Sequence, residues 1–595
     1  MAESIPITDY KDLGRYFTKK KQNRDPARSD LRTIYALDTE TYEGDIFLIA
    51  DSEGWYLDKI TPEAVLKFLF HKRYQNSWNF FYNLSYDAEV ILKLLSSELF
   101  RYNQTRDLSF EFGEFRVQYV PNKCLKVSKG HHTASFFDIA QFYNNTSLAK
   151  AYQSNIGNLE SSYLEFKSKR KEFSPTFYRR NTSKVREYCI SDCIYTKQLA
   201  EKWIQLFHNA FSFYPQRWIS SGYLAEKVLI NNGIEFPKFN SISYEIQELA
   251  LRSYFGGRFE MHKRGFIGTA YLYDINSAYP NAITKIPDLA NGQWVSGKTI
   301  YDNAEMGFFR IHANIPDCKY IPPFPFRIRN NIVFPSGKFE TYVTLEELRA
   351  YKNSDFYKIL DSWQFIPFSH TYPFEEFIEK MYLKRLELKA KNDPMQLPIK
   401  IILNSIYGKT GQKVRRIIGN LFNPVIFAFI TGYARAQLYR FVMEQGIERE
   451  TVAFATDSIC CTKKLDIDSE KLGEFSFEGS ADDVFFLQNG FYRFNGKWKQ
   501  RGLGKIGSKQ IEHLETLEKD GKLYYKARVL RNTRLRSSII QNKLSEIGKI
   551  KEVTREINLN ADRKRFWLGR IENIDSKNTN DSMPISMNYF EKDEI

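Results

Sequence analysis

Residues 269–280 of the chain are TAYLYDINSAYP, an apolar stretch that ends in an acid, Asp274, and is closed by Pro280. Aromatic and apolar residues followed by turn-forming Asn and Ser predict a β-strand that runs into a turn. The carboxylate of Asp274 is thereby placed at the end of a strand. A single acid in a turn has an ordinary structural explanation, so its meaning depends on the stretches around it.

Two later stretches also carry polar side chains in ordered positions. In KIILNSIYG, Lys400, Asn404 and Tyr407 are spaced i, i+4 and i+7, which places them on one face of a helix. In AFATDSICC, two short apolar stretches flank Thr-Asp-Ser, which predicts a β-hairpin with Asp457 at its tip. The chain therefore presents, in order, a strand-end acid, a basic helix face and a hairpin acid.

A second group of acids lies upstream. In TIYALDTET, Asp38 and Glu40 are two positions apart on a predicted strand, so both carboxylates point to one face. Such a like-charged pair is unfavourable unless a cation or a proton intervenes. Asp87, in NLSYD, opens an apolar helix, and in YCISD Tyr188 and Asp192 share a helix face.

These four acids and the aligned tyrosine, in this order, resemble the DEDD 3′–5′ exonucleases that have tyrosine in their third motif. The resemblance implies an RNase H-like domain in which Asp38, Glu40, Asp87 and Asp192 hold two divalent ions and Tyr188 orients the attacking water. The element Ser147-Leu148-x-x-Ala151 resembles the family's contact to the single-stranded primer end, and Asn83 is expected to contact DNA as well.

The strand acid, helix and hairpin acid resemble motifs A, B and C of family B DNA polymerases, whose right-hand fold has palm, fingers and thumb. The resemblance implies that Asp274, Asp457 and the carbonyl of Ile275 bind two Mg²⁺ ions, with Mn²⁺ as an alternative. These ions would lie between a primer-template DNA and the incoming deoxynucleoside triphosphate.

Nucleotide contacts follow from the same resemblance. Lys400 would meet the incoming phosphates, and Asn404 and Tyr407 would line the base-pair pocket. Tyr279 would lie beneath the sugar and exclude a 2′-hydroxyl. On the helix before Lys400, three further cations could assist it: Lys384, Arg385 and Lys389.

Several features resemble the protein-primed branch found in bacteriophages, adenoviruses and linear plasmids. Tyr254-Phe-Gly256-Gly257 matches that branch's YxGG linker, which contacts DNA, and 126 positions separate Asp274 from Lys400. That interval, which includes FPSGKFETYVTLEEL, has room for an insertion that contacts a terminal protein. The partner expected from this resemblance is a priming protein that donates a Ser, Thr or Tyr hydroxyl.

The chain also departs from the family pattern. Ala455 stands where motif C commonly has its first acid, and Gly490 stands where a KxY lysine is expected before Tyr492. Lys497, Lys499 or Arg501 could replace that cation on the primer strand. Only 49 positions separate Gly408 from Asp457, which leaves little room for a second insertion around downstream DNA. We therefore expect weak strand displacement and processivity.

The chain is expected to be α/β and multidomain, because 595 residues exceed what one hydrophobic core usually supports. Residues 526–570, with 13 Lys/Arg and 4 Asp/Glu, would grip duplex phosphates. The expected layout is an arm (1–32), exonuclease domain (33–215), linker with the YxGG element (216–260), palm with the insertion (261–372), fingers (373–427), palm with motif C (428–505), and a thumb followed by a loose C-terminal tail (506–595).

Bulk properties agree with a nucleic-acid enzyme and leave alternatives open. The net charge of +15 suits a polyanionic partner. The six scattered cysteines indicate a reducing compartment, here a host cytoplasm, or a mitochondrial matrix if a mitochondrial plasmid encodes the chain. Apolar runs are too short for a membrane helix, and we expect a monomer with no membrane partner. The alternatives are an exonuclease with a degenerate polymerase half, a conventionally primed family B polymerase and a non-catalytic scaffold.

Overall fold

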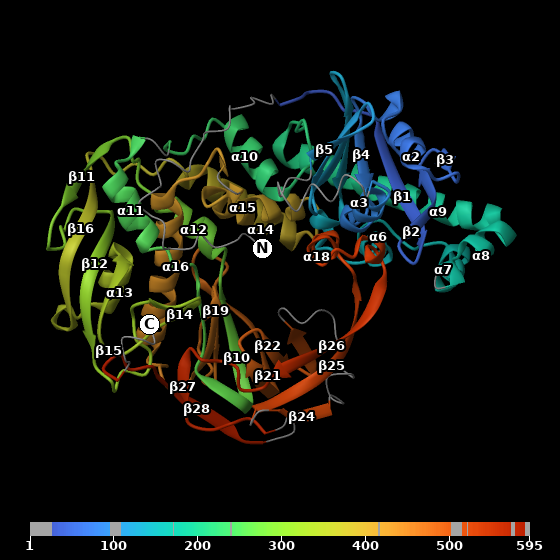
Figure 1. The fold of residues 1–595 in the computed structure, drawn as a ribbon. Coiled ribbons are helices and arrows are strands. Elements are labelled where there is room, and N and C mark those ends of the chain that lie inside the picture. The colour runs from blue at the N-terminus through green and yellow to red at the C-terminus, as the bar shows by residue number, and fades with distance from the viewer. Residues whose placement is uncertain are drawn as a thin grey trace.

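Four β-sheets and a helical hairpin form the main parts of the molecule (Figure 1). The structure is a computed structural model that describes residues 27–95, 109–169, 172–238, 241–414, 417–500, 515–519, 522–572 and 577–589. Most of the expected N-terminal arm therefore lies outside the described residues.

The N-terminal domain is built on an eight-stranded sheet with the order β3-β2-β1-β4-β8-β7-β6-β5. Strands β1, β4 and β8 are parallel, and the remaining pairs are antiparallel, including the expected β1–β2 hairpin. The strands are β1 (Ile34–Tyr42), β2 (Asp45–Asp51), β3 (Tyr56–Leu57), β4 (Trp78–Phe81), β5 (Ser109–Phe112), β6 (Phe115–Val120), β7 (Cys124–Lys129) and β8 (His132–Asp138).

Helices cover both faces of this sheet. Phe80 of β4 belongs to the same apolar cluster as Trp203 of α9, whereas its neighbour Phe81 packs with Leu84 and Ala88 of α3. The alternation places α9 and α3 on opposite faces. The helical segments are α2 (Pro62–Leu69), η2 (Lys72–Tyr74), α3 (Leu84–Lys93), η3 (Ala140–Tyr143), α6 (Leu148–Asn155), α7 (Ser161–Ser168), α8 (Pro175–Arg180) and α9 (Thr182–Phe211), followed by the linker helices α10 (Ser221–Asn231) and α11 (Tyr244–Arg252).

The palm is a second sheet, with the order β23-β22-β21-β10-β20-β19-β9 and two further strands, β27 and β28, at its side. The expected strand-to-turn stretch is β10 followed by α12, and the expected hairpin is β19–β20. The elements are β9 (Arg258–Met261), β10 (Lys263–Ile275), α12 (Ala278–Thr284), α16 (Pro424–Gln445), β19 (Thr451–Thr456), β20 (Ser458–Cys461), β21 (Phe475–Gln488), β22 (Phe491–Phe494) and β23 (Lys497–Gln500).

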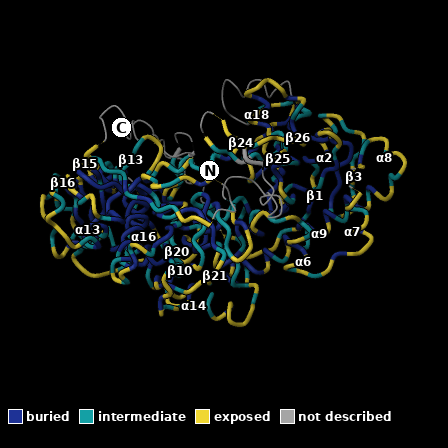
Figure 2. Tube along the Cα trace, turned by 90° about the horizontal axis from the view of Figure 1, so that it is seen from below, coloured by how far each residue is buried: buried dark blue, intermediate teal, exposed yellow. Residues whose placement is uncertain are grey.

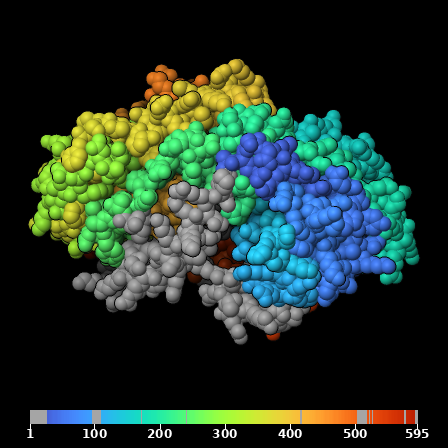
Figure 3. All heavy atoms as spheres, turned by 90° about the horizontal axis from the view of Figure 1, so that it is seen from above, coloured from blue at the N-terminus to red at the C-terminus, as the bar shows by residue number. Residues whose placement is uncertain are grey.

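A four-stranded antiparallel sheet, β11-β16-β12-β15, follows motif A. This insertion and the N-terminal domain form opposite ends of the molecule, as Figure 3 shows from above. Its elements are β11 (Gly292–Ser296), β12 (Met306–Ile315), β13 (Phe326–Ile328), β14 (Asn331–Val333), β15 (Gly337–Thr344), α13 (Leu345–Tyr351), η6 (Ser354–Phe356) and β16 (Tyr357–Pro367).

The fingers are the expected helical hairpin. Helix α14 (Glu375–Ala390) and helix α15 (Gln396–Thr410) are joined by a turn in which Asn392 has a positive φ of 52°. A small hairpin of β17 (Lys413–Val414) and β18 (Ile417–Ile418) then leads into α16. Buried segments run through α16 on one side of the molecule and through β1 and α9 on the other (Figure 2).

The thumb is a three-stranded sheet, β24-β25-β26, whose tip packs on the N-terminal domain. Leu535, Ile539, Leu544 and Ile547, in and around the tip helices, join the apolar cluster of α3. The elements are β24 (Glu515–Lys519), β25 (Lys522–Asn532), α18 (Leu535–Ile540), η7 (Leu544–Glu546) and β26 (Ile550–Asn558).

The C-terminal segment differs from the loose tail expected from its polar composition. Strands β27 (Arg565–Trp567) and β28 (Thr579–Pro584) pair with each other, and β28 pairs with residues 263–265 of β10. The buried Arg565 donates to Glu260 Oε1 of β9 at 2.9 Å. Backbone pairing and this buried ion pair hold the segment in place. Its hydrophobic pattern alone did not predict that it would form strands.

Over the parts of the chain that the structure describes, no helix combines the length and apolar composition that a bilayer crossing requires.

Candidate active sites

The N-terminal carboxylate cluster consists of Asp38, Glu40, Asp87 and Asp192. The side chains of Glu40, Asp87 and Asp192 are buried, with exposed fractions of 1%, 3% and 4%. Asp87 lies in the first turn of α3, where the positive end of the helix dipole favours a carboxylate. Its Oδ1 accepts hydrogen bonds from Thr39 N (3.2 Å) and Thr39 Oγ1 (2.6 Å), which tie α3 to β1.

The second helix of this cluster is α9, and the structure places Tyr188 and Asp192 on its buried face, as expected from their spacing. The ring of Tyr188 stacks on that of Tyr163 of α7, with 5.3 Å between centroids. The Tyr163 hydroxyl donates to Asp192 Oδ1 at 2.5 Å and accepts from Lys167 Nζ at 2.7 Å. Tyr163 and Lys167 were missed by the sequence analysis, because neither lies in a recognisable motif.

Another missed residue is Asp138, at the end of β8. Its Oδ1 accepts from the backbone N–H groups of Asn83 and Ala140, each at 3.0 Å. Burial raises the pKa of Asp138 to about 6. Because Asn83 has a left-handed φ of 63° and immediately precedes α3, Asp138 fixes the start of the helix that carries Asp87. The sequence does contain a sign of this residue: in SFFDIA, Asp138 follows an apolar stretch typical of a strand end.

Asp38, Glu40 and Cys189 offer ligand atoms that lie within 4.8 Å of one another. Cys189 donates to the Asp38 carbonyl at 3.7 Å, and its thiol pKa is raised well above its usual value by a hydrogen bond with Cys193 and by burial. The oxygens of Asp38 and Glu40 are therefore the donors suited to a hard divalent cation, and they fit Mg²⁺ or Mn²⁺.

A cavity of about 1030 Å³ opens beside this cluster. Thumb residues Asn532, Lys549, Ile550 and Lys551 form one of its walls. The predicted residues that line it are Asp38, Asn83, Asp87, Ser147, Leu148 and Asp192, so three of the four expected metal ligands share one space with the expected primer contacts; Glu40 and Tyr188 do not line it.

The palm carboxylate pair is formed by Asp274 and Asp457. Asp274 is the next-to-last residue of β10 and lies opposite Ser458 in the β10–β20 register. The N–H of Ile275 donates to the carbonyl of Asp457 at 2.9 Å, so the backbones of motifs A and C are joined directly.

Motif C has a strained turn. Thr456 has a φ of +74°, and the N–H of Asp457 donates to the carbonyl of Ala455 at 2.9 Å, the i→i+2 bond of a γ-turn. A β-branched residue with positive φ costs on the order of 1–3 kcal/mol. The turn places Asp457 at the tip of the hairpin, where its carbonyl is bonded to Ile275 of motif A.

Electrostatics distinguishes this pair from ordinary surface acids. The pKa of Asp274 is raised to about 7 by burial, then by the negative charges of Asp457 and Glu478, with Lys400 acting in the opposite sense. Burial also raises the pKa of Asp457. Two carboxylates held this way favour binding of a cation or a proton. The oxygen-only donor set, with the Ile275 carbonyl, fits Mg²⁺ or Mn²⁺.

Glu478 is a third acid that the sequence analysis missed. Leu272 and Tyr273 of β10 pair with Gly479 and Phe477, so Glu478 is the extra residue of a bulge in β21. Bulges next to functional sites redirect side chains. Only the register of two strands far apart in sequence reveals this position, so no local pattern could have found it.

The expected nucleotide side of the site is assembled around aromatic rings. Tyr279 and Tyr407 lie 4.4 Å apart between centroids, and the hydroxyls of Tyr407 and Tyr254 are 3.0 Å apart. A Cβ at Gly257 would lie 2.7 Å from Thr456 Cγ2 and 3.1 Å from the Tyr279 hydroxyl, so only glycine fits there. The YxGG element therefore lies against motif C.

A buried arginine that the sequence analysis missed holds this element in place. Arg435 of α16 donates to the carbonyl of Gly256 at 2.5 Å and to Glu347 at 2.8 Å. Gly256 itself has a φ of +74°. An arginine within the apolar sequence of α16 was the available signal.

Helix α15 presents the expected face. Lys400 and Asn404 are exposed and Tyr407 is half-buried. Of the three candidate helper cations on α14, Arg385 approaches motif A, because its Nη1 donates to Ser277 Oγ at 3.3 Å. Lys384 instead donates to the carbonyl of Ala210 at 3.3 Å. Exposed Lys389 lies near the end of α14.

Of the candidate cations for the KxY position, Lys499 lies beside Tyr492 on the neighbouring strand. Tyr492 of β22 pairs with Lys499 of β23, whose Nζ lies 5.6 Å from the Tyr492 ring, and Phe486 stacks on that ring at 4.7 Å. Lys499 is therefore the lysine beside Tyr492. Lys497, two residues earlier on the same strand, is paired with Phe494 instead. Arg501 lies outside the described residues.

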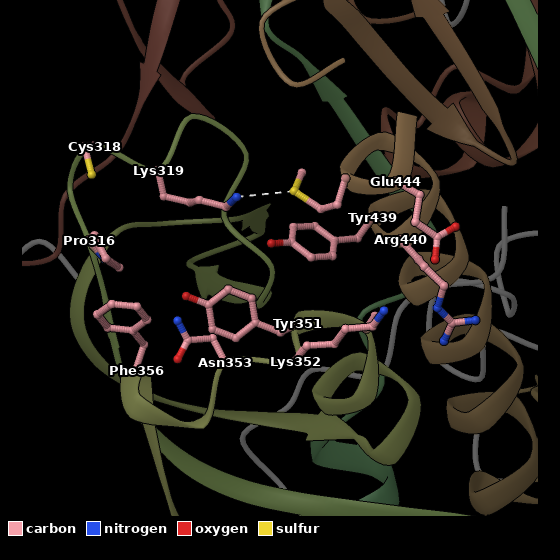
Figure 4. A pocket seen from close by; sticks show the side chains of 12 residues that line it. Pro316, Cys318, Lys319, Tyr351, Lys352, Asn353, Phe356, Tyr439, Arg440 and Glu444 are labelled. Atoms are coloured by element: carbon pink, nitrogen blue, oxygen red, sulfur yellow. Dashed lines mark hydrogen bonds between the residues drawn. The ribbon is translucent and has the colours of Figure 1, made fainter. Parts of the chain in front are cut away.

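A further cavity of about 440 Å³ lies between the insertion and the last turns of α16 (Figure 4). The rings of Tyr351, Phe356 and Tyr439 surround it, and Lys319 donates to Met443 Sδ at 3.2 Å at its edge. None of the residues expected to bind metal, nucleotide or DNA lines this cavity.

Comparisons with known proteins agree with this arrangement. Residues 72–418 match the family model described as DNA polymerase type B, organellar and viral, and the chain belongs to that family. The DNA polymerase of Acidianus bottle-shaped virus is 24% identical over 535 residues, 83% of this chain and 79% of that protein. A probable DNA polymerase of Ascobolus immersus is 25% identical over 249 residues, 40% of this chain and 20% of that protein.

Solved structures confirm the fold. Phi29 DNA polymerase complexed with primer-template DNA and incoming nucleotides superposes with a TM-score of 0.59 at 15% identity, covering 89% of this chain and all of that one. The same enzyme complexed with single-stranded DNA gives a TM-score of 0.60 over the same shares, also at 15% identity. The expected fold class, an RNase H-like exonuclease-type domain followed by a right-hand polymerase, is confirmed. The chain is a DNA-directed DNA polymerase.

Proposed function

We propose that the palm carboxylate pair catalyses template-directed addition of deoxynucleotides, and that the N-terminal carboxylate cluster removes misincorporated nucleotides from the primer 3′ end. The observation that carries the proposal is the 2.9 Å hydrogen bond from the N–H of Ile275 to the carbonyl of Asp457. This bond joins the backbones of motifs A and C, and so brings Asp274 and Asp457 together from distant parts of the sequence. The raised pKa values of both acids support the proposal, because closely held carboxylates favour a bound cation.

In the polymerase reaction, Asp274, Asp457 and the Ile275 carbonyl hold two Mg²⁺ ions. Two Mg²⁺ ions held there would lower the pKa of the primer 3′-hydroxyl and balance the negative charge of the departing pyrophosphate. Lys400 and Arg385 bind the triphosphate from the fingers side. The adjacent rings of Tyr279 and Tyr407 form the floor on which the sugar and base rest, which disfavours a ribose 2′-hydroxyl.

In the 3′–5′ exonuclease reaction, Asp38, Glu40, Asp87 and Asp192 hold the divalent cations. Tyr188 orients the attacking water, and Tyr163 keeps Asp192 aligned through its hydroxyl. The primer end enters the cavity lined by Asn83, Ser147, Leu148 and the thumb wall, where Lys549 and Lys551 attract its phosphates.

Primer extension and 3′-end degradation with Mg²⁺ test this division of labour. Asp457→Ala is expected to abolish extension and leave degradation, and Asp38→Ala is expected to do the reverse. If Asp457→Ala still extends primers, the polymerase site is wrongly assigned; if Asp38→Ala still degrades 3′ ends, the exonuclease site is wrongly assigned.

We further propose that replication of a viral or linear-plasmid genome starts on a protein. The four-stranded insertion between motif A and the fingers supports this, because it offers a separate surface at the end of the molecule. Incubation with labelled deoxynucleotide and candidate partner proteins should yield a covalently labelled protein. Labelling confined to annealed oligonucleotide primers would favour conventional priming.

The small β17–β18 hairpin supports weak strand displacement, because it occupies the interval in which a second insertion would lie. On a primed circle we expect short products from each binding event. Extension of many kilobases from one binding event would contradict this expectation.

A further inference from the structure

A buried ion pair joins the fingers to the linker helix α10. Lys409, at the end of α15, donates to Glu226 Oε2 at 2.8 Å and to Gln412 Oε1 at 2.5 Å. The side chains of Lys409 and Glu226 are only 10% and 5% exposed. The remaining carboxylate oxygen, Glu226 Oε1, accepts from Asn420 Nδ2 at 2.7 Å.

One carboxylate therefore binds both ends of the segment 409–420, which contains the β17–β18 hairpin. Glu226 holds Lys409 before the hairpin and Asn420 after it. Linker helix α10 packs closely here, since a Cβ at Gly222 would lie 3.0 Å from Lys409 Cδ. The base of the hairpin and the last turn of α15 are thus fixed to the linker.

The charge of Lys409 also acts on a residue of the N-terminal domain. The pKa of Lys123, in the β6–β7 turn, is lowered by burial and by the positive charge of Lys409. The contacts of the Glu226 carboxylate itself join two parts of the molecule, the linker helix α10 and the fingers.

Lys409 stands two residues after Tyr407, whose ring meets Tyr279 and whose hydroxyl meets Tyr254. A buried charge pair is weak evidence for stability, because desolvation offsets most of its attraction, but it imposes a defined geometry. A fixed Lys409 would hold the last turn of α15 at one position along the helix axis and one rotation about it. Tyr407 lies in the same turn, so its position would be held as well.

We propose that Glu226 and Lys409 are positioning residues for the incoming nucleotide, acting through Tyr407. The inference rests on the proposed role of Tyr407 in the nucleotide pocket. Neither residue touches the reacting atoms, so their loss should weaken nucleotide binding and selection rather than the chemical step.

The test is the double variant Glu226→Gln/Lys409→Met, which removes both charges while keeping side-chain volume, so that no buried charge is left without a partner. Its matched control is Glu387→Gln/Lys391→Met, which removes an exposed pair on α14. Single-nucleotide incorporation is measured on a primer-template with each deoxynucleotide and with the matching ribonucleotide. Melting temperature and degradation of single-stranded DNA are measured in parallel.

The expected result for Glu226→Gln/Lys409→Met is a KM for deoxynucleotide raised about 10-fold, a kcat within about twofold of the parent, and a reduced preference for deoxynucleotides. Degradation of single-stranded DNA should be unchanged, and the control pair should behave as the parent. Asn420→Ala, which removes one of the two contacts, should raise KM by a smaller factor.

A KM within twofold of the parent in both Glu226→Gln/Lys409→Met and Asn420→Ala overturns the inference. So does a fall in kcat that tracks a lower melting temperature at constant KM, because that pattern is expected of a purely structural pair. Failure of the proposed function is distinguishable, since it would appear as extension by Asp457→Ala, whatever the behaviour of Glu226 and Lys409.

Discussion

The two carboxylate sites of this polymerase are built in opposite ways. In the N-terminal cluster, strand β1 and helices α3 and α9 supply four acids, three of which are buried, and hydroxyls of Thr39 and Tyr163 bind Asp87 and Asp192. In the palm, two adjacent strands supply a half-buried pair whose carboxylates accept no hydroxyl bond among the described contacts, and both pKa values are raised. Protein hydroxyls thus stabilise part of the first site, whereas in the second the charge of Asp457 acts directly on Asp274.

The difference predicts how each site responds to substitution. In the N-terminal cluster, removing one hydroxyl should lower the reaction rate by a limited factor, because the carboxylates remain. In the palm pair, removing the charge of either carboxylate should nearly abolish nucleotide incorporation.

The largest effect is expected at the palm pair. Asp274→Asn should lower nucleotide incorporation by at least about 1,000-fold, because one of two charged cation ligands is lost. Degradation of single-stranded DNA by the same variant should remain at the parental rate. Equal loss of both activities would show that the two sites are not independent.

A smaller effect is expected when a hydroxyl is removed from the N-terminal cluster. Tyr163→Phe keeps the ring stacked on Tyr188 but removes the 2.5 Å hydrogen bond to Asp192. The rate of 3′-end degradation should fall about 10- to 100-fold, as for other groups that orient a metal ligand. Primer extension should be unaffected, and Tyr244→Phe, at an exposed position, is the matched control.

The thumb contact offers a third comparison. Leu535→Ala removes a buried side chain from the α3 cluster, whereas Leu530→Ala removes one that is 74% exposed on the thumb sheet. The buried substitution should cost about 2–5 kcal/mol of docking energy. We expect degradation of single-stranded DNA to fall several-fold in Leu535→Ala only. Equal degradation rates in the two variants would show that docking of the thumb on the N-terminal domain does not contribute to 3′-end degradation.

The smallest effect concerns stability and pH. An acid whose pKa is higher in the folded chain than in the unfolded chain favours folding when protonated, so this contribution is lost as pH rises from about 4 to about 7. In the absence of metal, Asp274→Asn should therefore melt a few degrees above the parent at pH 8 and at the same temperature near pH 4. Addition of Mg²⁺ at pH 8 should raise the melting temperature of the parent more than that of the variant. A variant less stable at pH 8 would contradict the raised pKa.

Much of this organisation could be predicted from local patterns. The strand with Asp38 and Glu40, the helices with Asp87 and Asp192, and the hairpin with Asp457 all formed as their spacing indicated, because each lies within one element. The fingers hairpin was equally local.

Residues that depend on distant pairing could not be found this way. Glu478 reaches Asp274 only through the register of β10 and β21, and Tyr163 reaches Asp192 from a helix with little amphipathic pattern. Strand β28 is mostly polar, and it is held by backbone pairing with β10 and β27. Sequence periodicity reports burial within an element and carries little information on which elements become neighbours.

The position of β28 has a consequence for how the protein is made. Residues 579–581 pair with residues 263–265 in the sheet that carries Asp274, so the two strands are separated by most of the polymerase half. On the ribosome, the N-terminal domain can fold while the chain is still being elongated, but the palm sheet is complete only after residue 581 has been translated. A chain that stops before residue 579 would carry a folded N-terminal domain without a complete palm, so synthesis of β28 is the step that completes the polymerase sheet.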